Sequence, residues 1–469
     1  MMFPPGVYLE RRKRLKQQVE SGVLLFLGNA DTPMNYPQNP YPFRQDSSFL
    51  YFWGLDLPDL AAIIDIDEDR EVIFGRGADP DEIVWTGPRQ SIGELAQGSG
   101  VSQTAAPEAL ESVLRKDQQS GRSIHWLPQY RAENRLTLQR LLTLDPDCVD
   151  AKVSGAFIRA VVAQRSIKSE AEVAQIEAAL GISHDMHRLA MQMTRPGLLE
   201  RDIVGAIAGL AYAQSGFNLA FPTIFSINGQ ILHNPHHDNV MCTGDLVIHD
   251  SGAESPMHYS SDVTRTFPVD GRFSARQKEI YAIVLDAQQK AVEAVLPGVE
   301  FRQVHHVACR QLSAGLKSLG LMKDDVDEAV ASGAHTLFFP CGLGHMLGLD
   351  VHDMESLGED FVGYTDSIPR DPRFGIRRLR LAKPLEPGFV VTIEPGLYFI
   401  PELIDQWQAE KSLEQFINYR KVGEYRGLGG VRIEDDVLVT ANGRRVLGKP
   451  IPKTIDEVEA ASSERRQAP

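Results

Sequence analysis

Four acidic residues interrupt apolar, strand-like runs in the C-terminal half of the chain. Asp250 closes LVIHD, Asp262 opens DVTRTF, Glu394 lies in VTIEPG and Glu434 lies in VRIEDD. A single acidic residue at a strand end usually forms a turn or a cap. Four such carboxylates buried together could not all ionise unless cations compensated them. The joint pattern therefore indicates a fold built around bound cations.

The same part of the chain also offers an imidazole, His345 in CGLGHMLGLDVHD. Four carboxylates and one imidazole form a hard, oxygen-rich donor set that favours Mn²⁺, Fe²⁺, Co²⁺ or Mg²⁺ over a thiolate-type structural zinc site. Two divalent ions would neutralise the carboxylates, and ions that share bridging carboxylates hold a nucleophilic hydroxide at neutral pH. The pattern predicts hydrolysis. We expect two divalent ions per chain, Mn²⁺ first, with Co²⁺, Fe²⁺ or Zn²⁺ as alternatives.

The length of 469 residues requires at least two domains. From Val23 to Gln129, runs such as VLLFL, SFLYFWGL, AAIIDID and EVIFG alternate with Gly, Pro and Asp, which indicates strands of a compact α/β domain. Farther on, capping-box spacings at Ser169 and Ser274 predict two long helices, and a third is expected over Arg302–Gly320. Blocks of strand-like runs among these helices predict an α+β catalytic domain with a mostly antiparallel sheet.

Charge and cysteine content narrow the partners and the compartment. The net charge of −15 opposes nucleic acid and anionic membranes as partners. The four cysteines (Cys148, Cys242, Cys309 and Cys341) form no CxxC pair, which disfavours a disulfide framework and a structural zinc site. We expect a reducing cytoplasm. We also expect no signal peptide and no membrane span, because the apolar runs are too short.

Five separated motifs occur in order along the chain: ILHN, HDSGAE with SDVTRTFP, GHMLGLDVHD, TIEPGLYF and GGVRIEDD. With YPFRQDSSFLYFWGL and SIKSEAEVAQI before them, the sequence resembles the pita-bread metallopeptidases, and within them the aminopeptidase P and prolidase group. The resemblance implies a creatinase-like, aminopeptidase P-like α/β domain over residues 1–160, a pita-bread catalytic domain over 161–455 and a polar tail over 456–469. It also implies an Xaa-Pro exopeptidase that acts on proline-containing peptides or dipeptides and forms a homo-oligomer, a dimer or a tetramer.

The resemblance implies a role for each candidate metal ligand. Asp250 would bind one metal ion, and His345 and Glu394 would bind the other. Asp262 and Glu434 would bridge both ions. Glu394 would also orient or deprotonate the attacking water, as a general base does.

Further residues would contact the substrate or support the ligands. His233 in ILHN and His352 in LDVHD match histidines that stabilise the tetrahedral intermediate or the leaving nitrogen. Arg432, two residues before Glu434 on the same strand face, would hold that carboxylate; a plain surface arginine is the alternative.

Two positions depart from the family pattern. The spacing from Asp250 to Asp262 is one residue longer than usual, and the extra residue falls in SPMHY, where it fits a longer turn between paired strands. Cys341 stands where much of the family has a substrate-contacting histidine, four residues before His345. Neighbouring divalent cations should lower the pKa of the Cys341 thiol and make it reactive; an inert buried thiol is the alternative.

The substrate length stays open between two activities. YPFRQDSSF resembles aminopeptidase P, which accepts peptides longer than dipeptides and is the activity expected first. Arg380 in GIRRLR matches an arginine with which prolidases bind the carboxylate of a C-terminal proline, which would make the chain an Xaa-Pro dipeptidase. An inactive relative that acts as a binding protein is disfavoured, as is creatine amidinohydrolase, because all five ligand positions are chemically competent. Methionine aminopeptidase is disfavoured by the N-terminal domain.

Overall fold

The computed structural model describes residues 3–77, 83–85, 87–88, 90–215 and 219–464. The chain divides into two compact units, one formed by Met1–Arg165 with Met354–Phe361 and the other by Ser166–Asp353 with Val362–Pro469. The domain limits expected from the sequence, 1–160 and 161–455, stay a prediction. Within the described ranges, no helix combines the length and the apolar character needed to cross a bilayer.

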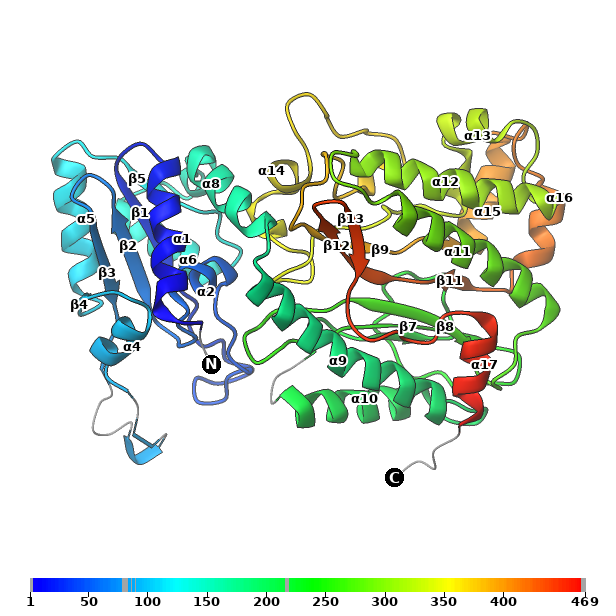
Figure 1. Ribbon diagram of the computed structural model, residues 1–469, viewed down its shortest axis with the longest axis horizontal. Helices are drawn as coiled ribbons and strands as arrows, with labels where there is room; N and C mark the ends of the chain where they lie inside the picture. The colour runs from blue at the N-terminus through cyan, green and yellow to red at the C-terminus, as the bar shows by residue number, and fades with distance from the viewer. Residues whose placement is uncertain (1–2, 78–82, 86, 89, 216–218, 465–469) are drawn as a thin grey trace. The chain divides into compact units, whose positions relative to one another are not determined.

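The N-terminal unit is built on a five-stranded sheet with the order β4-β3-β2-β1-β5. β1–β2 and β2–β3 pair antiparallel, whereas β1–β5 and β3–β4 pair parallel. The strands are β1 (Val23–Leu27), β2 (Ala61–Asp65), β3 (Arg70–Phe74), β4 (Gln103–Ala105) and β5 (Ile124–Trp126), and the helices are α1 (Pro5–Gln18), α2 (Ser47–Trp53), α4 (Ile92–Gly98), α5 (Ala109–Gln119), α6 (Ala132–Leu142), α7 (Cys148–Ala151) and α8 (Gly155–Ser166) (Figure 1). Leu25, Ile63 and Leu114 lie in its core. The expected α/β domain is therefore present.

The run SFLYFWGL, expected as a strand, forms helix α2 instead. All seven residues of α2 are buried, and an element that is apolar on every side shows no periodicity that separates a helix from a buried strand. The residues at the two ends do indicate a helix. The Asp46 side chain caps its N-terminus by accepting a hydrogen bond from the Phe49 N–H, and Gly54 ends it with φ 67°.

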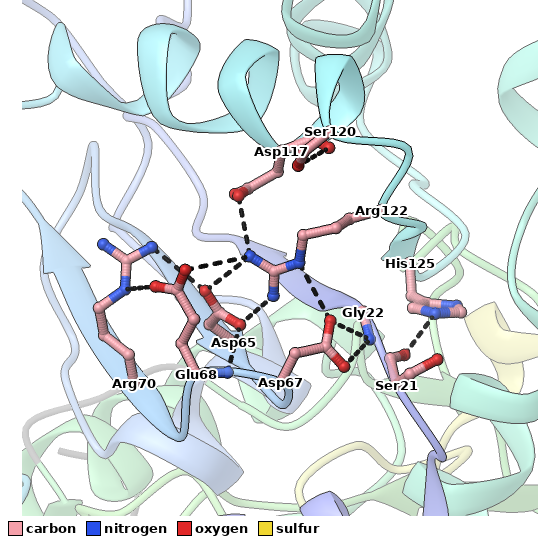
Figure 2. A network of polar contacts seen from close by, with 10 residues as sticks. All are labelled: Ser21, Gly22, Asp65, Asp67, Glu68, Arg70, Asp117, Ser120, Arg122 and His125. Carbon is pink, nitrogen blue, oxygen red and sulfur yellow. Dashed lines mark hydrogen bonds and ion pairs between the residues drawn. The ribbon is translucent and has the colours of Figure 1, made fainter.

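Arg122 joins several carboxylates of the N-terminal unit (Figure 2). Its guanidinium binds Asp65 and donates to Asp67 Oδ2 at 3.0 Å and to Asp117 Oδ1 at 2.9 Å. Arg70 donates to the second oxygen of Asp65 at 3.2 Å. The buried carboxylate of Asp65, at 0% exposure, is therefore matched by two guanidinium groups.

The second unit contains three small sheets, and every pairing within them is antiparallel, as expected. One has the order β6-β7-β8, one β13-β12-β9 and one β10-β11. The strands are β6 (Ile224–Ser226), β7 (Leu246–Ser251), β8 (Val263–Pro268), β9 (Val390–Ile393), β10 (Gly396–Tyr398), β11 (Gly430–Arg432), β12 (Asp435–Thr440) and β13 (Gly443–Val446). The expected α+β class is confirmed.

Helices cover these sheets. α9 and α10 lie side by side, as do α11 and α12, with α9 against β8 and α11 against β9, β10 and β11 (Figure 1). Both predicted capping boxes are present, at Ser169 and at Ser274. The elements are α9 (Glu170–Met193), α10 (Glu200–Ser215), α11 (Ala275–Ala294), α12 (Phe301–Ser318), α13 (Val326–Ser332), α14 (Glu359–Gly363), α15 (Pro401–Glu410), α16 (Tyr419–Val422), α17 (Ile455–Ser463) and the short 3-10 turns η1 (Ala334–Leu337), η2 (Glu355–Leu357), η3 (Ile376–Arg378) and η4 (Gly423–Tyr425).

The expected polar tail over 456–469 is wrong for its first part. Residues Ile455–Ser463 form α17, which begins with a capping box between Thr454 and Glu457. Val458 is 0% exposed and joins the core of the second unit, so apolar burial and the cap together order this segment. Residues 465–469 lie outside the described residues.

Candidate metal centre and active site

Asp250 and Asp262 come from the two arms of one hairpin. Asp250 lies near the end of β7, and Asp262 directly precedes β8. The arms approach so closely that a Cβ at Gly252 would lie 1.7 Å from the Ser261 carbonyl oxygen, so only glycine fits there. The turn between the arms contains His258 at φ 65°. The hairpin brings both aspartates to one end of the sheet.

Glu394 and Glu434 lie where two strands change sheets. The sequence predicts one strand over VRIEDDVLVT, but β11 ends before Glu434 and β12 begins after it. Glu394 likewise separates β9 from β10. Because Ile393 pairs with Asp435, and the β10–β11 ladder keeps the same register, the two glutamates fall opposite each other in the break. In the break the Glu434 N–H donates instead to the Thr264 carbonyl of β8 at 3.1 Å, which holds this glutamate beside Asp262 at the start of β8.

His345 is fixed by backbone contacts with β9. Its N–H donates to Thr392 Oγ1 at 3.1 Å, and its carbonyl accepts from the Thr392 N–H at 3.0 Å. A Cβ at Gly344 would lie 2.0 Å from the Thr392 carbonyl oxygen, so glycine is needed for this close approach. The Leu343 carbonyl accepts from the Glu394 N–H at 2.8 Å. These bonds bring the His345 loop to the glutamates.

The His345 ring faces the carboxylates through Nε2. Nδ1 lies 3.0 Å from the Met346 carbonyl oxygen, which only accepts, so the proton is on Nδ1 and Nε2 keeps its lone pair. Nε2 lies 3.4 Å from Asp262 Oδ2 and 3.5 Å from Glu394 Oε1. Ligand atoms of Asp262, His345 and Glu434 all lie within 4.8 Å of one another.

The electrostatics of this cluster fit divalent cations. Burial, followed by neighbouring carboxylates, raises the pKa of Asp262 and that of Glu434 well above their usual ranges. Burial raises the pKa of Glu394 to about 7. Oδ1 of Asp250 and Oδ1 of Asp262 are buried without a hydrogen-bond partner among the described residues. Divalent ions would both ionise these carboxylates and engage the unpartnered oxygens.

Arg432 binds a different carboxylate from the one expected. Its guanidinium donates to Asp250 Oδ2 at 2.5 Å and to the Tyr398 hydroxyl at 2.9 Å. It reaches Glu434 only through Thr264, whose hydroxyl accepts from Arg432 Nε at 3.1 Å and donates to Glu434 Oε2 at 2.6 Å. Arg432 thus reaches Glu434 through Thr264, and its expected role in holding that carboxylate stays a prediction.

A cavity of about 390 Å³ opens onto the cluster. His233 and His352 line it, and the ring of His352 lies 4.4 Å from that of His345 in an edge-on arrangement. Burial, followed by the charge of Arg432, lowers the pKa of His233. The apolar part of the wall comes from Phe221, Ile224, Leu232 and Val351. The cavity thus joins polar groups on one side to an apolar surface on the other.

Cys341 and Arg380 differ in their relation to the cavity. Cys341 lines it, and burial, followed by the charge of Glu394, raises the pKa of its thiol. The lowering expected beside bound cations stays a prediction. Arg380 is half-buried and is not among the described residues that line the cavity. Its charge still contributes to lowering the pKa of His233 and of His345.

Sequence reasoning missed four residues of the site. Thr264 follows Asp262 at strand alternation, which places both on one face. Asp436 stands in the same relation to Glu434, and its carboxylate accepts from the Asp262 N–H at 3.1 Å. Tyr398 and His237 also line the cavity; Tyr398 lies in the TIEPGLYF motif and His237 follows ILHN by three residues, and these positions were the available signals.

Comparisons with known proteins agree with this geometry. Residues 174–441 match the model of metallopeptidase family M24, and residues 8–125 match that of the aminopeptidase P N-terminal domain. The chain is 32% identical to Xaa-Pro aminopeptidase of Haemophilus influenzae, with 97% of each chain covered. It is 29% identical to Xaa-Pro dipeptidase of Homo sapiens, with 98% of this chain and 94% of the other covered. Zinc-substituted aminopeptidase P of Escherichia coli in complex with product shares 30% identity and a TM-score of 0.81 over 100% of both chains.

These matches confirm the resemblance seen in the motifs. The two matched models follow the order of the two units in the chain, and the fold is the two-domain fold of aminopeptidase P, an N-terminal domain followed by a pita-bread domain. A metallopeptidase also accounts for buried carboxylates that need divalent cations. The chain belongs to metallopeptidase family M24.

Proposed function

We propose that this chain is an Xaa-Pro aminopeptidase that uses two divalent metal ions to hydrolyse the bond between an N-terminal residue and a following proline. One observation carries the proposal: the cavity of about 390 Å³ in which four carboxylates, two substrate-side histidines and an apolar wall meet. The names of the relatives, which include Xaa-Pro aminopeptidase and Xaa-Pro dipeptidase, support a proline-containing substrate.

Five side chains would hold the metal ions: Asp250, Asp262, His345, Glu394 and Glu434. Asp262 and Glu434 would bridge the two ions, Asp250 would bind one, and His345 with Glu394 the other. When bound, divalent ions supply Lewis acidity and activate water at neutral pH. Mn²⁺ is the expected metal because the donors are mostly carboxylate oxygens, and Co²⁺, Fe²⁺ and Zn²⁺ are the alternatives.

The other steps belong to the chain's own residues. Glu394 lines the cavity, where its carboxylate would accept the proton of the attacking water. His233 is held neutral by burial and by the charge of Arg432. His233 and His352 would hydrogen-bond the tetrahedral intermediate or the leaving nitrogen. Cys341, on the same wall, would contact the substrate in place of the family's histidine.

The apolar wall suits proline. A bond before proline is a tertiary amide without an N–H, so a peptidase cannot align it through that donor. The wall of Phe221, Ile224, Leu232 and Val351 would instead position the pyrrolidine ring by burying its methylene groups, at about 0.8 kcal/mol for each group buried.

Metal analysis coupled to peptide hydrolysis tests the proposal. The purified protein should contain two divalent ions per chain and release the first residue from Xaa-Pro-Yaa peptides. A chelator should abolish this activity, and added Mn²⁺ or Co²⁺ should restore it. Metal-loaded protein that binds these peptides without cleaving them would show instead an inactive binding protein.

A second candidate activity, Xaa-Pro dipeptidase, is favoured by the charge that Arg380 directs toward the site. If Arg380 binds the substrate carboxylate, Arg380→Ala should raise KM for Xaa-Pro dipeptides by about 10- to 100-fold and leave tripeptides nearly unchanged. Arg378→Ala, at an exposed position of the same segment, is the matched control. Equal effects on dipeptides and tripeptides would remove Arg380 from substrate binding.

The proposal includes an assembly and a compartment. A homo-oligomer, a dimer or a tetramer, is expected from the family resemblance, and sedimentation would measure it. The four free cysteines support a reducing compartment, the cytoplasm.

A further inference from the structure

A second group of metal-binding side chains lies apart from the metallopeptidase centre. His305 and Cys309 are four residues apart on α12 and therefore share one face of the helix, and His335 lies in η1. The three residues are 2%, 0% and 3% exposed. None of them lines the catalytic cavity described above, and the proposed hydrolysis uses none of them.

The spacing of these groups approaches that of a zinc site. The ligand atoms of His305, Cys309 and His335 all lie within 4.8 Å of one another, and Cys309 Sγ lies 3.4 Å from His305 Nε2. Tetrahedral zinc, with Zn–S near 2.3 Å and Zn–N near 2.0–2.1 Å, holds sulfur and nitrogen about 3.5 Å apart. The first pair already has this separation, and His335 offers a ring nitrogen within 4.8 Å of both.

The two imidazoles already have the protonation state of metal ligands, whereas burial raises the pKa of the Cys309 thiol, so a bound ion has to displace the thiol proton. Burial lowers the pKa of His305 well below its usual range and that of His335 to about 4, so both imidazoles are neutral, the form that binds metals. Nδ1 of His335 is buried and finds no hydrogen-bond partner within the described part of the chain. An unpartnered buried nitrogen costs free energy that a bound ion would recover.

A separate cavity gives access. It has a volume of about 370 Å³ and is lined by His305, His306 and His335 together with Arg373, so a water can supply a fourth ligand. Arg373 pairs with Asp371 at 2.7 Å. This pair offsets part of the positive charge at the cavity, although the charge of Arg373 still contributes to lowering the pKa of His335.

We propose that His305, Cys309 and His335 form a mononuclear site for a thiophilic divalent ion, Zn²⁺, distinct from the metallopeptidase centre. Two imidazoles and one thiolate suit zinc, whereas the carboxylate-rich centre suits harder ions. The absence of a CxxC pair argues against a thiolate-rich zinc site but not against a site with one thiolate. On binding, the ion takes the place of the Cys309 thiol proton, which passes to solvent.

The site would act on the catalytic loop through η1. The ion would tie α12 to η1, and the chain runs from η1 directly to Cys341 and His345. A tie between a long helix and this short turn would hold the start of the loop that carries both residues. Its role is positional, since none of its ligands touches the catalytic cavity.

Cobalt spectroscopy of the metal-stripped protein tests the site. Co²⁺ bound to a thiolate gives a charge-transfer absorption that carboxylate and imidazole ligands do not give. We expect this absorption in the wild-type chain, its loss in Cys309→Ser and its retention in Cys341→Ser, which removes the thiol of the catalytic cavity. A wild-type chain without the absorption would overturn the proposal, and so would loss in Cys341→Ser with retention in Cys309→Ser.

Zinc content gives an independent measurement. After dialysis against buffered Zn²⁺, His335→Gln should hold one zinc ion fewer per chain than the wild type. His306→Gln, which changes a histidine on the wall of the same cavity outside the ligand trio, should keep the wild-type content. Equal zinc content in all three proteins would contradict the site, with circular dichroism confirming that each is folded. If His335→Gln does not fold, the cobalt spectrum of the wild type decides.

Discussion

The two units bury carboxylates in opposite ways. In the N-terminal unit, Asp65 receives guanidinium groups from Arg122 and Arg70 (Figure 2). In the catalytic unit, Asp262 and Glu434 lie among further carboxylates. The nearby Arg432 donates its hydrogen bonds to Asp250, Tyr398 and Thr264. In the N-terminal cluster, arginine side chains balance the negative charge of the buried carboxylate, and we call this cluster matched. In the catalytic cluster, the contacts of Arg432 leave the charges of Asp262 and Glu434 unbalanced, and we call this cluster unmatched.

The pKa directions express this difference. Burial alone would raise the pKa of Asp65, but hydrogen bonds from Arg122, from the Glu68 N–H and from Arg70 together outweigh it, and the pKa is lowered. At the centre, burial and like charges act together, and the pKa of Asp262 is raised. A matched cluster stabilises the folded chain by itself, whereas an unmatched cluster is stable only with protons or cations. The mismatch therefore supports our proposal that the second cluster binds divalent cations.

The largest effect should follow from changing Glu434, one of the two proposed bridging ligands. Glu434→Gln keeps the shape of the side chain but removes a charge, so kcat/KM should fall by more than about 100-fold, beyond the 10- to 100-fold typical of groups that only orient ligands. Elemental analysis should show fewer bound ions. Asp65→Asn is the matched control in the other cluster and should leave the metal content unchanged. Full activity of Glu434→Gln would end the assignment of this residue as a ligand.

The next effect concerns the matched cluster. Arg122→Ala should lower the free energy of unfolding of the N-terminal unit by about 2–3 kcal/mol, somewhat less than a fully buried pair loses, because Arg122 keeps 16% exposure. Denaturant unfolding would measure it. Arg115→Ala removes an exposed helical pair with Glu111 and should cost only a few tenths of a kcal/mol. A loss of bound metal in Arg122→Ala would contradict the independence of the two clusters.

The sequence predicted those elements whose signals are local. The helices at Ser169 and Ser274 carry capping boxes, and both form. The run that became α2 carries no such contrast along its length, because it is buried on every side. The strand break at Glu434 was missed because it depends on two partners, β9 and β10, that pair with different sheets.

The same contrast between local sequence signals and long-range pairing holds at the site. The candidate ligands Asp262, His345 and Glu434 could be named from motifs, and the structure brings their ligand atoms together. The partner of Arg432 could not, since Asp250 lies 182 residues away on another sheet. Alternation along one strand predicts neighbours on that strand's face but not which side chain arrives from a neighbouring sheet.

Replacing a carboxylate by a neutral amide should change the stability of the metal-stripped protein in opposite directions in the two clusters. The folded pKa of Glu394 is raised to about 7, so in metal-stripped protein its charge costs stability above pH 7, and this cost declines as pH falls through 7 toward the unfolded value of about 4.3. Metal-stripped Glu394→Gln should therefore be more stable than stripped wild type at pH 8, by up to about 4 kcal/mol at about 1.4 kcal/mol per pKa unit, with the advantage shrinking toward pH 5.

The matched cluster should show the reverse. The pKa of Asp65 is lowered, so its charge stabilises the fold at pH values above about 4 and the contribution is lost only below that. Asp65→Asn should be less stable than wild type at both pH 5 and pH 8. Thermal unfolding of the stripped proteins measures both differences. A stripped Glu394→Gln that is less stable than wild type at pH 8 would show that the centre is matched in some other way.

The smallest effect on metal binding should follow from removing the Thr264 hydroxyl, which links Arg432 to Glu434. Thr264 and Thr266 lie on the same face of β8, and both are 0% exposed. Thr264 donates to Glu434 Oε2 at 2.6 Å, whereas Thr266 donates to the Arg432 carbonyl at 2.9 Å. Thr264→Val removes a bond to a ligand, so metal affinity should fall about 10-fold. Thr266→Val removes a bond to the backbone only.

The two valine variants form a matched pair, because each replaces a buried threonine by a residue of the same shape. Both should lose a similar free energy of unfolding, about 1–3 kcal/mol for leaving a buried partner unsatisfied. Only Thr264→Val should bind the metal more weakly, as measured by competition with a chelator of known affinity. Equal metal affinities in the two variants would mean that Glu434 is positioned by its backbone in the strand break alone, and that the network around Arg432 serves Asp250 rather than the whole centre.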